Sequence, residues 1–262
     1  MNNRRPDEAD CRRTSRLTNL PLIVAAGCAL LPFIAVHTAY ILAADAGQVP
    51  WCNPYFDSCT SISATGRQPP ASFVFKGVML PCAMLIAVFW WLQWRWLQAA
   101  GGRAAQLLWM LGLGWLACLG LALYVIVLGE VGDWLRLQRK IGTILFFSFT
   151  FLAQLLLAAE LRRIPAAGMP GGGTAPARAA IFGRAMLRTC FLMLCIGVLS
   201  VIIQAISEPW HDAVEDAIEW SLALLLQVNF LIVALLWRHP PADLRFHTSA
   251  LVESAASADS ST

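Results

Sequence analysis

The stretch HDAVEDAIEW, which starts at His211, gathers the side chains best suited to acid–base chemistry or to binding a polar headgroup. In a continuous helix its acidic residues would share one face at i, i+3, i+4 and i+7: Asp212, Glu215, Asp216 and Glu219. The beginning of this stretch is expected at the level of lipid headgroups, where the positive end of the helix dipole favours acidic groups. Glu219 would lie deeper, where an isolated carboxylate must be protonated or paired.

A lysine in another apolar segment offers a partner for that carboxylate. Lys76 enters its segment at about the same depth as Glu219, and an ion pair between them would offset two charges that are each costly in lipid. The alternative is that Lys76 extends its ammonium group to the headgroup region.

Further polar residues fall within or beside apolar segments. His37 lies five residues after Pro32 and three before Tyr40, so it is a candidate site residue or a hydrogen-bond partner of a neighbouring helix. A later segment carries polar residues at helical spacing near the same end: Ser200, Gln204, Ser207 and Glu208. These residues either line the same site or bond adjacent helices.

The polar segment WCNPYFDSCTSISATGRQPP, residues 51–70, separates two long apolar segments. Asn53-Pro54 favours a turn that would bring Cys52 and Cys59 together, and a disulfide there would constrain the unfolded chain. Two free thiols, or pairing with another thiol, are the alternatives. The loop 43–71 fits neither a helix nor a strand pattern and is expected to fold back as a lid. The remaining cysteines are expected to pack as small apolar residues: Cys11, Cys28, Cys82, Cys118, Cys190 and Cys195.

These polar residues are predicted to outline one chamber that opens at the lid and binds a lipid headgroup. Its candidates are His37, Asp57, Ser61, Ser63, Thr65, Lys76, Gln204, His211, Asp212, Glu215 and Glu219. Ester chemistry would need a nucleophile, a base and an oxyanion donor in mutual contact. Serines, histidines and an aspartate are present, but no spacing enforces their meeting, so catalytic residues are not assigned.

The elements that must position these residues are membrane helices. Of the 262 residues 58% are hydrophobic and only 13% are charged, and six apolar segments are each long enough to cross a bilayer. They are Leu20–Leu42, Ser72–Leu97, Ala105–Leu128, Ile141–Leu161, Met186–Ile206 and Ala217–Trp237. Backbone groups in lipid must be satisfied within a segment, so we predict an all-α bundle of six transmembrane helices over residues 20–237.

The distribution of Lys and Arg predicts the orientation. Most of the 19 basic residues fall in the N-terminal tail, in the loop 162–185, after the second segment and after the sixth. The opposite faces hold only five: Arg67, Lys76, Arg136, Arg139 and Lys140. The positive-inside rule therefore places both termini in the cytoplasm, with a basic tail at 1–19 and a disordered tail at 238–262. The loop 43–71 would then face an oxidising compartment, where disulfides persist.

Three motifs carry a resemblance to a known family. They are SISATGRQPPASFVF at residues 61–75, GTILFF at 142–147 and IEW at 218–220. With six spans, they resemble the Frag/DRAM/Sfk family of membrane proteins, which is related to a GPI-remodelling factor and to the Cwh N-terminal domain. The resemblance covers about residues 20–237 and implies six helices with cytoplasmic ends. Arg139 stands where members often carry a histidine, so histidine chemistry at that position is not expected to carry over.

Composition and motifs narrow the function classes. The net charge is only +3, which topology explains, and no phosphate-binding loop, zinc motif or nucleophile elbow is present, so we expect no nucleic acid, cofactor or metal. The favoured function is lipid-interacting or regulatory, in an Ala- and Arg-rich protein of a bacterial inner membrane. The alternatives are a lipid-remodelling acyltransferase or hydrolase and, third, a small transporter. Protein partners are not indicated.

Overall fold

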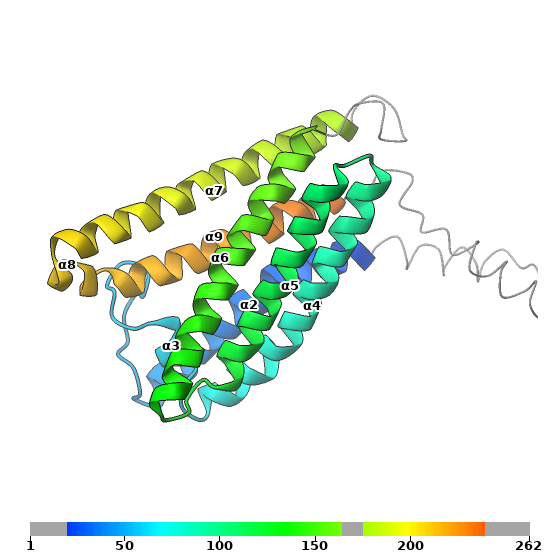
Figure 1. Cartoon of the computed structure of the whole chain (residues 1–262). Helices are drawn as coiled ribbons and strands as arrows, with labels where there is room; N and C mark the ends of the chain where they lie inside the picture. Colours follow the sequence, from blue (N-terminus) through cyan, green and yellow to red (C-terminus); the bar gives the residue numbers. More distant parts are fainter. Residues whose placement is uncertain (1–19, 164–174, 239–262) are drawn as a thin grey trace, which may run out of the picture.

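The computed structural model describes residues 20–163 and 175–238 of the chain, with side chains in the second range from residue 177 onwards (Figure 1). The six long helices are α2 (Leu20–Asp45), α4 (Ala71–Ala99), α5 (Ala104–Ile126), α6 (Asp133–Arg163), α7 (Ala175–Ile206) and α9 (Glu215–Trp237). Two short helices accompany them, α3 (Ile62–Thr65) and α8 (Glu208–Asp212). The predicted basic tail 1–19, the linker 165–173, the tail beyond residue 238 and Cys11 lie outside the described residues.

The predicted all-α membrane fold is confirmed for the described part of the chain. Each long helix is long and apolar enough to cross a membrane, and the described residues contain no strand. Large apolar side chains also cover the outside of the bundle, including Phe73, Trp109 and Phe191, which are each about 70% exposed. Lipid tails solvate such a surface, whereas water would not.

The six long helices pack as a closed ring in the order α2, α4, α5, α6, α7, α9 and back to α2. Phe89 and Trp90 of α4 meet Phe230 of α9 edge to face, with ring centroids 4.9–6.2 Å apart. Helices α5 and α6 approach closely at Gly120 and Gly142, where a Cβ atom on either glycine would collide with the facing backbone. Small residues permit this approach because packing drives helix association in lipid.

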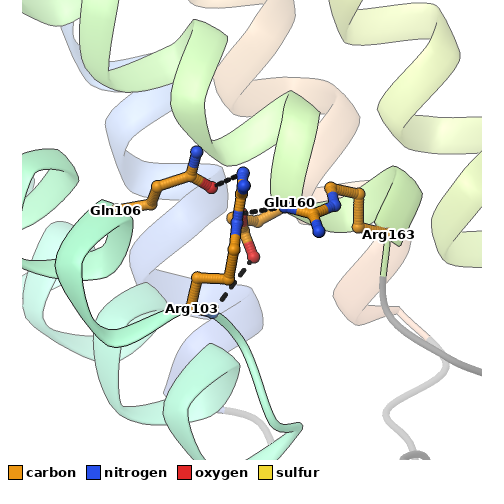
Figure 2. A network of polar contacts seen from close by, with 4 residues as sticks. All are labelled: Arg103, Gln106, Glu160 and Arg163. Atoms are coloured by element: carbon orange, nitrogen blue, oxygen red, sulfur yellow. Dashed lines mark hydrogen bonds and ion pairs between the residues drawn. The ribbon is translucent and has the colours of Figure 1, made fainter.

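The two ends of the bundle differ in their connections. One end carries residues 46–70, 127–132 and 207–214 and is called the loop end; the other carries residues 100–103 and is called the linker end. At the linker end, Glu160 of α6 is buried and meets Arg103, which precedes α5 (Figure 2). The Arg103 Nε and backbone N–H donate to the two Glu160 oxygens at 3.0 and 3.3 Å. Gln106 accepts from Arg103, and Arg163 lies 3.8 Å from Glu160.

Helix α7 packs against the bundle only over its first half. Ala179, Met186 and Cys190 are buried, whereas side chains from Leu194 to Ile206 are half-buried or exposed. Gly183 allows the close approach to α6, because a Cβ atom there would meet the Ala158 carbonyl oxygen at 3.0 Å. Towards the loop end α7 stands apart from α6 (Figure 1).

Two predicted helix boundaries are wrong. Helix α6 starts eight residues before the predicted Ile141, and α7 starts at Ala175 rather than Met186. Helix formation does not require an apolar sequence, so the charged turn DWLRLQRK extends α6 and an Ala- and Arg-rich stretch extends α7 beyond the hydrocarbon layer. The loop 43–71 contains the one-turn helix α3, which Ser61 caps by accepting a hydrogen bond from the Ala64 N–H.

Candidate functional site

The cysteine loop is held together by its own contacts. A disulfide joins Cys52 and Cys59, as predicted from their spacing. Inside the closed segment the Asp57 carboxylate accepts a hydrogen bond from the Asn53 N–H at 2.7 Å, and the Asn53 side chain accepts one from the Tyr55 N–H at 3.1 Å. Asn53 therefore forms the turn that brings the two cysteines together.

Two side chains of α2 fix the loop to the bundle. The Tyr40 hydroxyl accepts from the Cys52 N–H at 2.8 Å and donates to the Cys52 carbonyl at 2.7 Å. The Tyr55 hydroxyl lies 3.0 Å from His37 Nε2, and His37 Nδ1–H donates to the Phe33 carbonyl at 2.7 Å. The Phe33 carbonyl can only accept, so the proton of the neutral ring is on Nδ1. His37 Nε2 therefore accepts a hydrogen bond from the Tyr55 hydroxyl. Partial burial raises the pKa of the Tyr55 phenol.

Helix α9 supplies the other attachment. The Trp220 indole N–H donates to the Thr60 carbonyl at 2.9 Å, and the Ala217 N–H donates to the Ser58 hydroxyl at 3.3 Å. The Trp220 ring lies at the centre of an aromatic group, with its centroid 5.4–6.1 Å from those of His37, Tyr40 and Tyr55. The loop thus forms a cap over the ends of α2 and α9.

A mainly apolar pocket lies beneath this cap, with a cavity volume of about 50 Å³. Side chains from α2, α3, α4, α5, α6 and α9 line it, together with Tyr55 of the loop. Its polar groups are few: His37, Tyr55, Tyr124, Thr143, Glu219 and Gln227. A water molecule needs roughly 10–15 Å³ by this measure, so the pocket has room for about four waters or a slender part of a ligand.

Two polar groups in the pocket have no side-chain partner among the described residues. Tyr124 is only 6% exposed, and its hydroxyl makes no hydrogen bond. The Glu219 carboxylate bonds to the backbone of Ile62 but makes neither an ion pair nor a hydrogen bond to another described side chain. An unpaired polar group inside a membrane protein is costly, so a ligand or water that bonds to these oxygens would stabilise the folded chain.

The predicted Lys76–Glu219 ion pair does not form. Lys76 Nζ lies 3.9 Å from Glu130 Oε1 and donates to the Ile126 carbonyl at 3.5 Å. Ile126 is the last residue of α5, and Glu130 lies in the turn that follows it. Glu130 is exposed, so its charge is less costly there than that of a buried carboxylate, and the ammonium group reaches it from the end of α4.

The acidic face predicted for residues 212–219 is interrupted. Asp212 ends α8, and α9 begins only at Glu215 after a turn at Ala213–Val214. His211 Nδ1 lies 3.2 Å from Glu215 Oε2 and 3.9 Å from Asp212 Oδ1, while His211 Nε2 lies 3.3 Å from the Ser200 hydroxyl of α7. The two acids and His211 have ligand atoms within 4.8 Å of one another, so they could hold a metal ion.

The other predicted chamber residues serve local structure. Ser61 caps α3 and lies 3.1 Å from the Ser63 hydroxyl, and Thr65 is buried and donates to the Ile62 carbonyl. Asp57 stays within the cysteine turn, and Gln204 is exposed on α7. The single predicted chamber therefore divides into the capped pocket with His37 and Glu219, and a separate group around His211.

Sequence reasoning missed several pocket residues. Tyr124, Thr143 and Gln227 lie on three different helices, and their positions in the sequence give no sign of a common pocket. Trp220 was noted only as part of a motif, although its indole holds the cap. The free cysteines Cys28, Cys82, Cys118 and Cys190 are buried as predicted, but Cys195 is exposed.

Comparison with models of known protein families gives a match. The family model Frag1/DRAM/Sfk1/Cwh43P N-terminal domain matches residues 21–236, which is most of the chain. The chain belongs to this family. No curated protein and no solved structure was found to match it significantly. As a family member with six apolar helices it is an integral, multi-pass membrane protein.

Proposed function

We propose that this Frag1/DRAM-family protein binds part of a membrane lipid in the capped pocket at its loop end. The observation that carries the proposal is the buried Tyr124 hydroxyl, which has no hydrogen-bond partner among the described residues and lies in a pocket with a mainly apolar lining. A lipid matches both properties, because apolar groups can fill the pocket while a hydroxyl or carbonyl bonds to Tyr124 or Glu219.

The cap gives the proposal a regulatory element. Its contacts with α2 and α9 run through side chains that also line the pocket, namely His37, Tyr55 and Trp220. A ligand that enters the pocket therefore touches the same groups that hold the cap. Binding and cap position are coupled to the extent that a ligand prefers one arrangement of these side chains.

Lipid that remains with the purified full-length protein tests the pocket. Native mass spectrometry in detergent should show bound lipid on the wild-type chain and a loss of it in Ala223→Phe, because Ala223 lines the pocket. Ala205→Phe is the matched control, since Ala205 is exposed on α7. Equal lipid retention by both variants, with both eluting as folded protein, would contradict the proposal.

The group around His211 favours acyl transfer or hydrolysis as a second candidate function. With Nδ1–H directed at Glu215, His211 Nε2 is free to accept the Ser200 proton. The Ser200 oxygen would then bond to an ester carbonyl, the ester C–O bond would break, and His211 would protonate the leaving alcohol. Water or a second alcohol would release the acyl group from Ser200.

The loop serines do not support this chemistry. Ser61 and Ser63 bond to each other, and both nitrogens of His37 are occupied by Phe33 and Tyr55. A fluorophosphonate probe separates the possibilities: labelling of the wild type that disappears in Ser200→Ala but persists in Ser61→Ala supports the second candidate. If the probe does not label the wild type, the second candidate function is ruled out.

We further propose that the loop end faces the non-cytoplasmic side of a bacterial inner membrane. The disulfide supports this placement, since disulfides persist in oxidising compartments. The linker end carries arginines, among them Arg95, Arg103 and Arg162, as the positive-inside rule requires of a cytoplasmic face. A fluorescent protein that folds only in the cytoplasm should be bright when fused to the C-terminus. A dark fusion would show that the orientation is opposite to the one proposed.

A further inference from the structure

A second pocket, lined by charged side chains, opens at the loop end, between the segment before α4 and the turn that joins α5 to α6. Three arginines line it, Arg67, Arg136 and Arg139, together with Gly129, Glu130 and Gly132. Its cavity volume is about 310 Å³, which is several times that of the capped pocket. None of the candidate chamber residues belongs to it.

The backbone brings the three arginines together. Arg136 and Arg139 are three residues apart on α6 and so project from one side of the helix. Gly129 has φ +87°, and a Cβ atom there would collide with the Arg67 carbonyl oxygen. Glycine at this position therefore lets the turn after α5 lie directly against the backbone of Arg67.

The positive charge in this pocket is poorly neutralised by the described residues. Arg139 makes no ion pair or side-chain hydrogen bond with any of them, and the Arg67 guanidinium donates a hydrogen bond only to the Ser63 hydroxyl, at 3.4 Å. Arg136 lies 3.9 Å from the fully exposed Asp133. The one acid in the lining, Glu130, lies 3.9 Å from Lys76.

The loop end carries few basic residues, yet three of them, all arginines, line this one pocket. Lys76 lies close to the pocket, 3.9 Å from the lining residue Glu130. Like charges held together in this way repel one another, and a bound anion would remove that cost. Guanidinium groups present planar pairs of N–H donors that match the oxygens of a phosphate.

We propose that the Arg67–Arg136–Arg139 pocket binds a phosphate group. The pocket has room for a phosphate together with several waters, by the same measure of about 10–15 Å³ for each water. Val131, an apolar residue of the lining, is 93% exposed, so the pocket opens at the surface of the protein. The phosphate belongs either to a phospholipid headgroup or to a soluble phosphate. The inference does not depend on the lipid pocket under the cap.

Binding of two probes to the purified full-length protein in detergent tests this site. Short-chain phosphatidic acid and inorganic phosphate are titrated separately, with affinity measured by calorimetry. We expect Arg139→Gln and Arg67→Gln each to weaken binding by about ten-fold, because each removes charge-assisted hydrogen bonds to the phosphate. Arg139→Lys should retain more affinity than Arg139→Gln, since it keeps the charge.

Lys140→Gln is the matched control, because Lys140 follows Arg139 on α6, is exposed and does not line the pocket. Binding of both probes points to soluble phosphate as a ligand, and binding of phosphatidic acid alone points to a lipid headgroup. The proposal is overturned if the wild type binds neither probe or if Lys140→Gln weakens binding as much as Arg139→Gln. Ala223→Phe should leave the binding of inorganic phosphate unchanged, which separates a failure of this proposal from a failure of the capped pocket.

Discussion

The ion pair at the linker end should respond very differently to the loss of each partner. The Glu160 side chain is 3% exposed, whereas that of Arg103 is 48% exposed. Arg103→Ala would leave a buried carboxylate with only the backbone N–H of residue 103 and Arg163 at 3.8 Å. Glu160→Gln would instead leave a half-exposed guanidinium that water can solvate, with a neutral amide in the buried position.

The expected magnitudes follow from this asymmetry. Removing one partner of a buried ion pair costs about 3–5 kcal/mol, and the two contacts that remain on Glu160 place Arg103→Ala near the lower limit, at about 3 kcal/mol. The amide of Glu160→Gln still accepts a hydrogen bond, so its cost should be about 1 kcal/mol. Arg103→Ala combined with Glu160→Gln should be more stable than Arg103→Ala alone, because no buried charge remains.

The measurement is the free energy of unfolding in mixed micelles with an increasing fraction of denaturing detergent, followed by tryptophan fluorescence. All three variants and the wild type are compared at one pH and one salt concentration, since both affect charge interactions. Equal costs for Glu160→Gln and Arg103→Ala would refute this reasoning, and so would a double variant that is the least stable of the three. In either case, burial of the Glu160 carboxylate does not determine how much this ion pair contributes to stability.

Three further outcomes concern the cap. Replacing Cys52 and Cys59 by serine should lower stability by about 2.4 kcal/mol on the chain-entropy model, given their separation of seven residues; unchanged denaturant midpoints would contradict this. The raised pKa of Tyr55 means that the folded state keeps a proton that the unfolded state loses above about pH 10, so stability should fall as pH rises through that range, and Tyr55→Phe should flatten the fall. Trp220→Phe should cost about 1 kcal/mol and speed hydrogen exchange in the loop by removing an N–H donor; exchange as slow as in the wild type would argue against this attachment.

Local sequence properties were sufficient to predict the six long helices. An apolar segment in lipid must form its backbone hydrogen bonds within itself, so hydropathy predicts each span without knowledge of its neighbours. The same argument explains the errors at α6 and α7. Hydropathy detects the edge of the hydrocarbon layer, but a helix ends where its backbone is capped or broken, and α6 continues outward to Asp133.

Pairings between distant residues could not be predicted in the same way. Glu219 and Lys76 had suitable depth and opposite charge, yet the turn after α5 lies closer to Lys76 and offers Glu130. His37 was identified as a candidate, but its partner Tyr55 follows from the path of the disulfide-closed loop. Arg139 was noted as one of five basic residues on its side of the membrane and as a departure from a family pattern, and its pocket appears once α6 packs beside Arg67.

By itself, the sequence predicted the six long helices, the family resemblance and the disulfide, because each span, each family motif and the cysteine pair lies within a short stretch of the chain. Tertiary structure alone decided which polar groups meet, which stay unpaired and how the predicted single chamber divides. Those outcomes depend on the rotation and relative depth of six packed helices. Such quantities arise from side-chain contacts all around the ring, and a small rotation of a helix changes the neighbours of every residue on it.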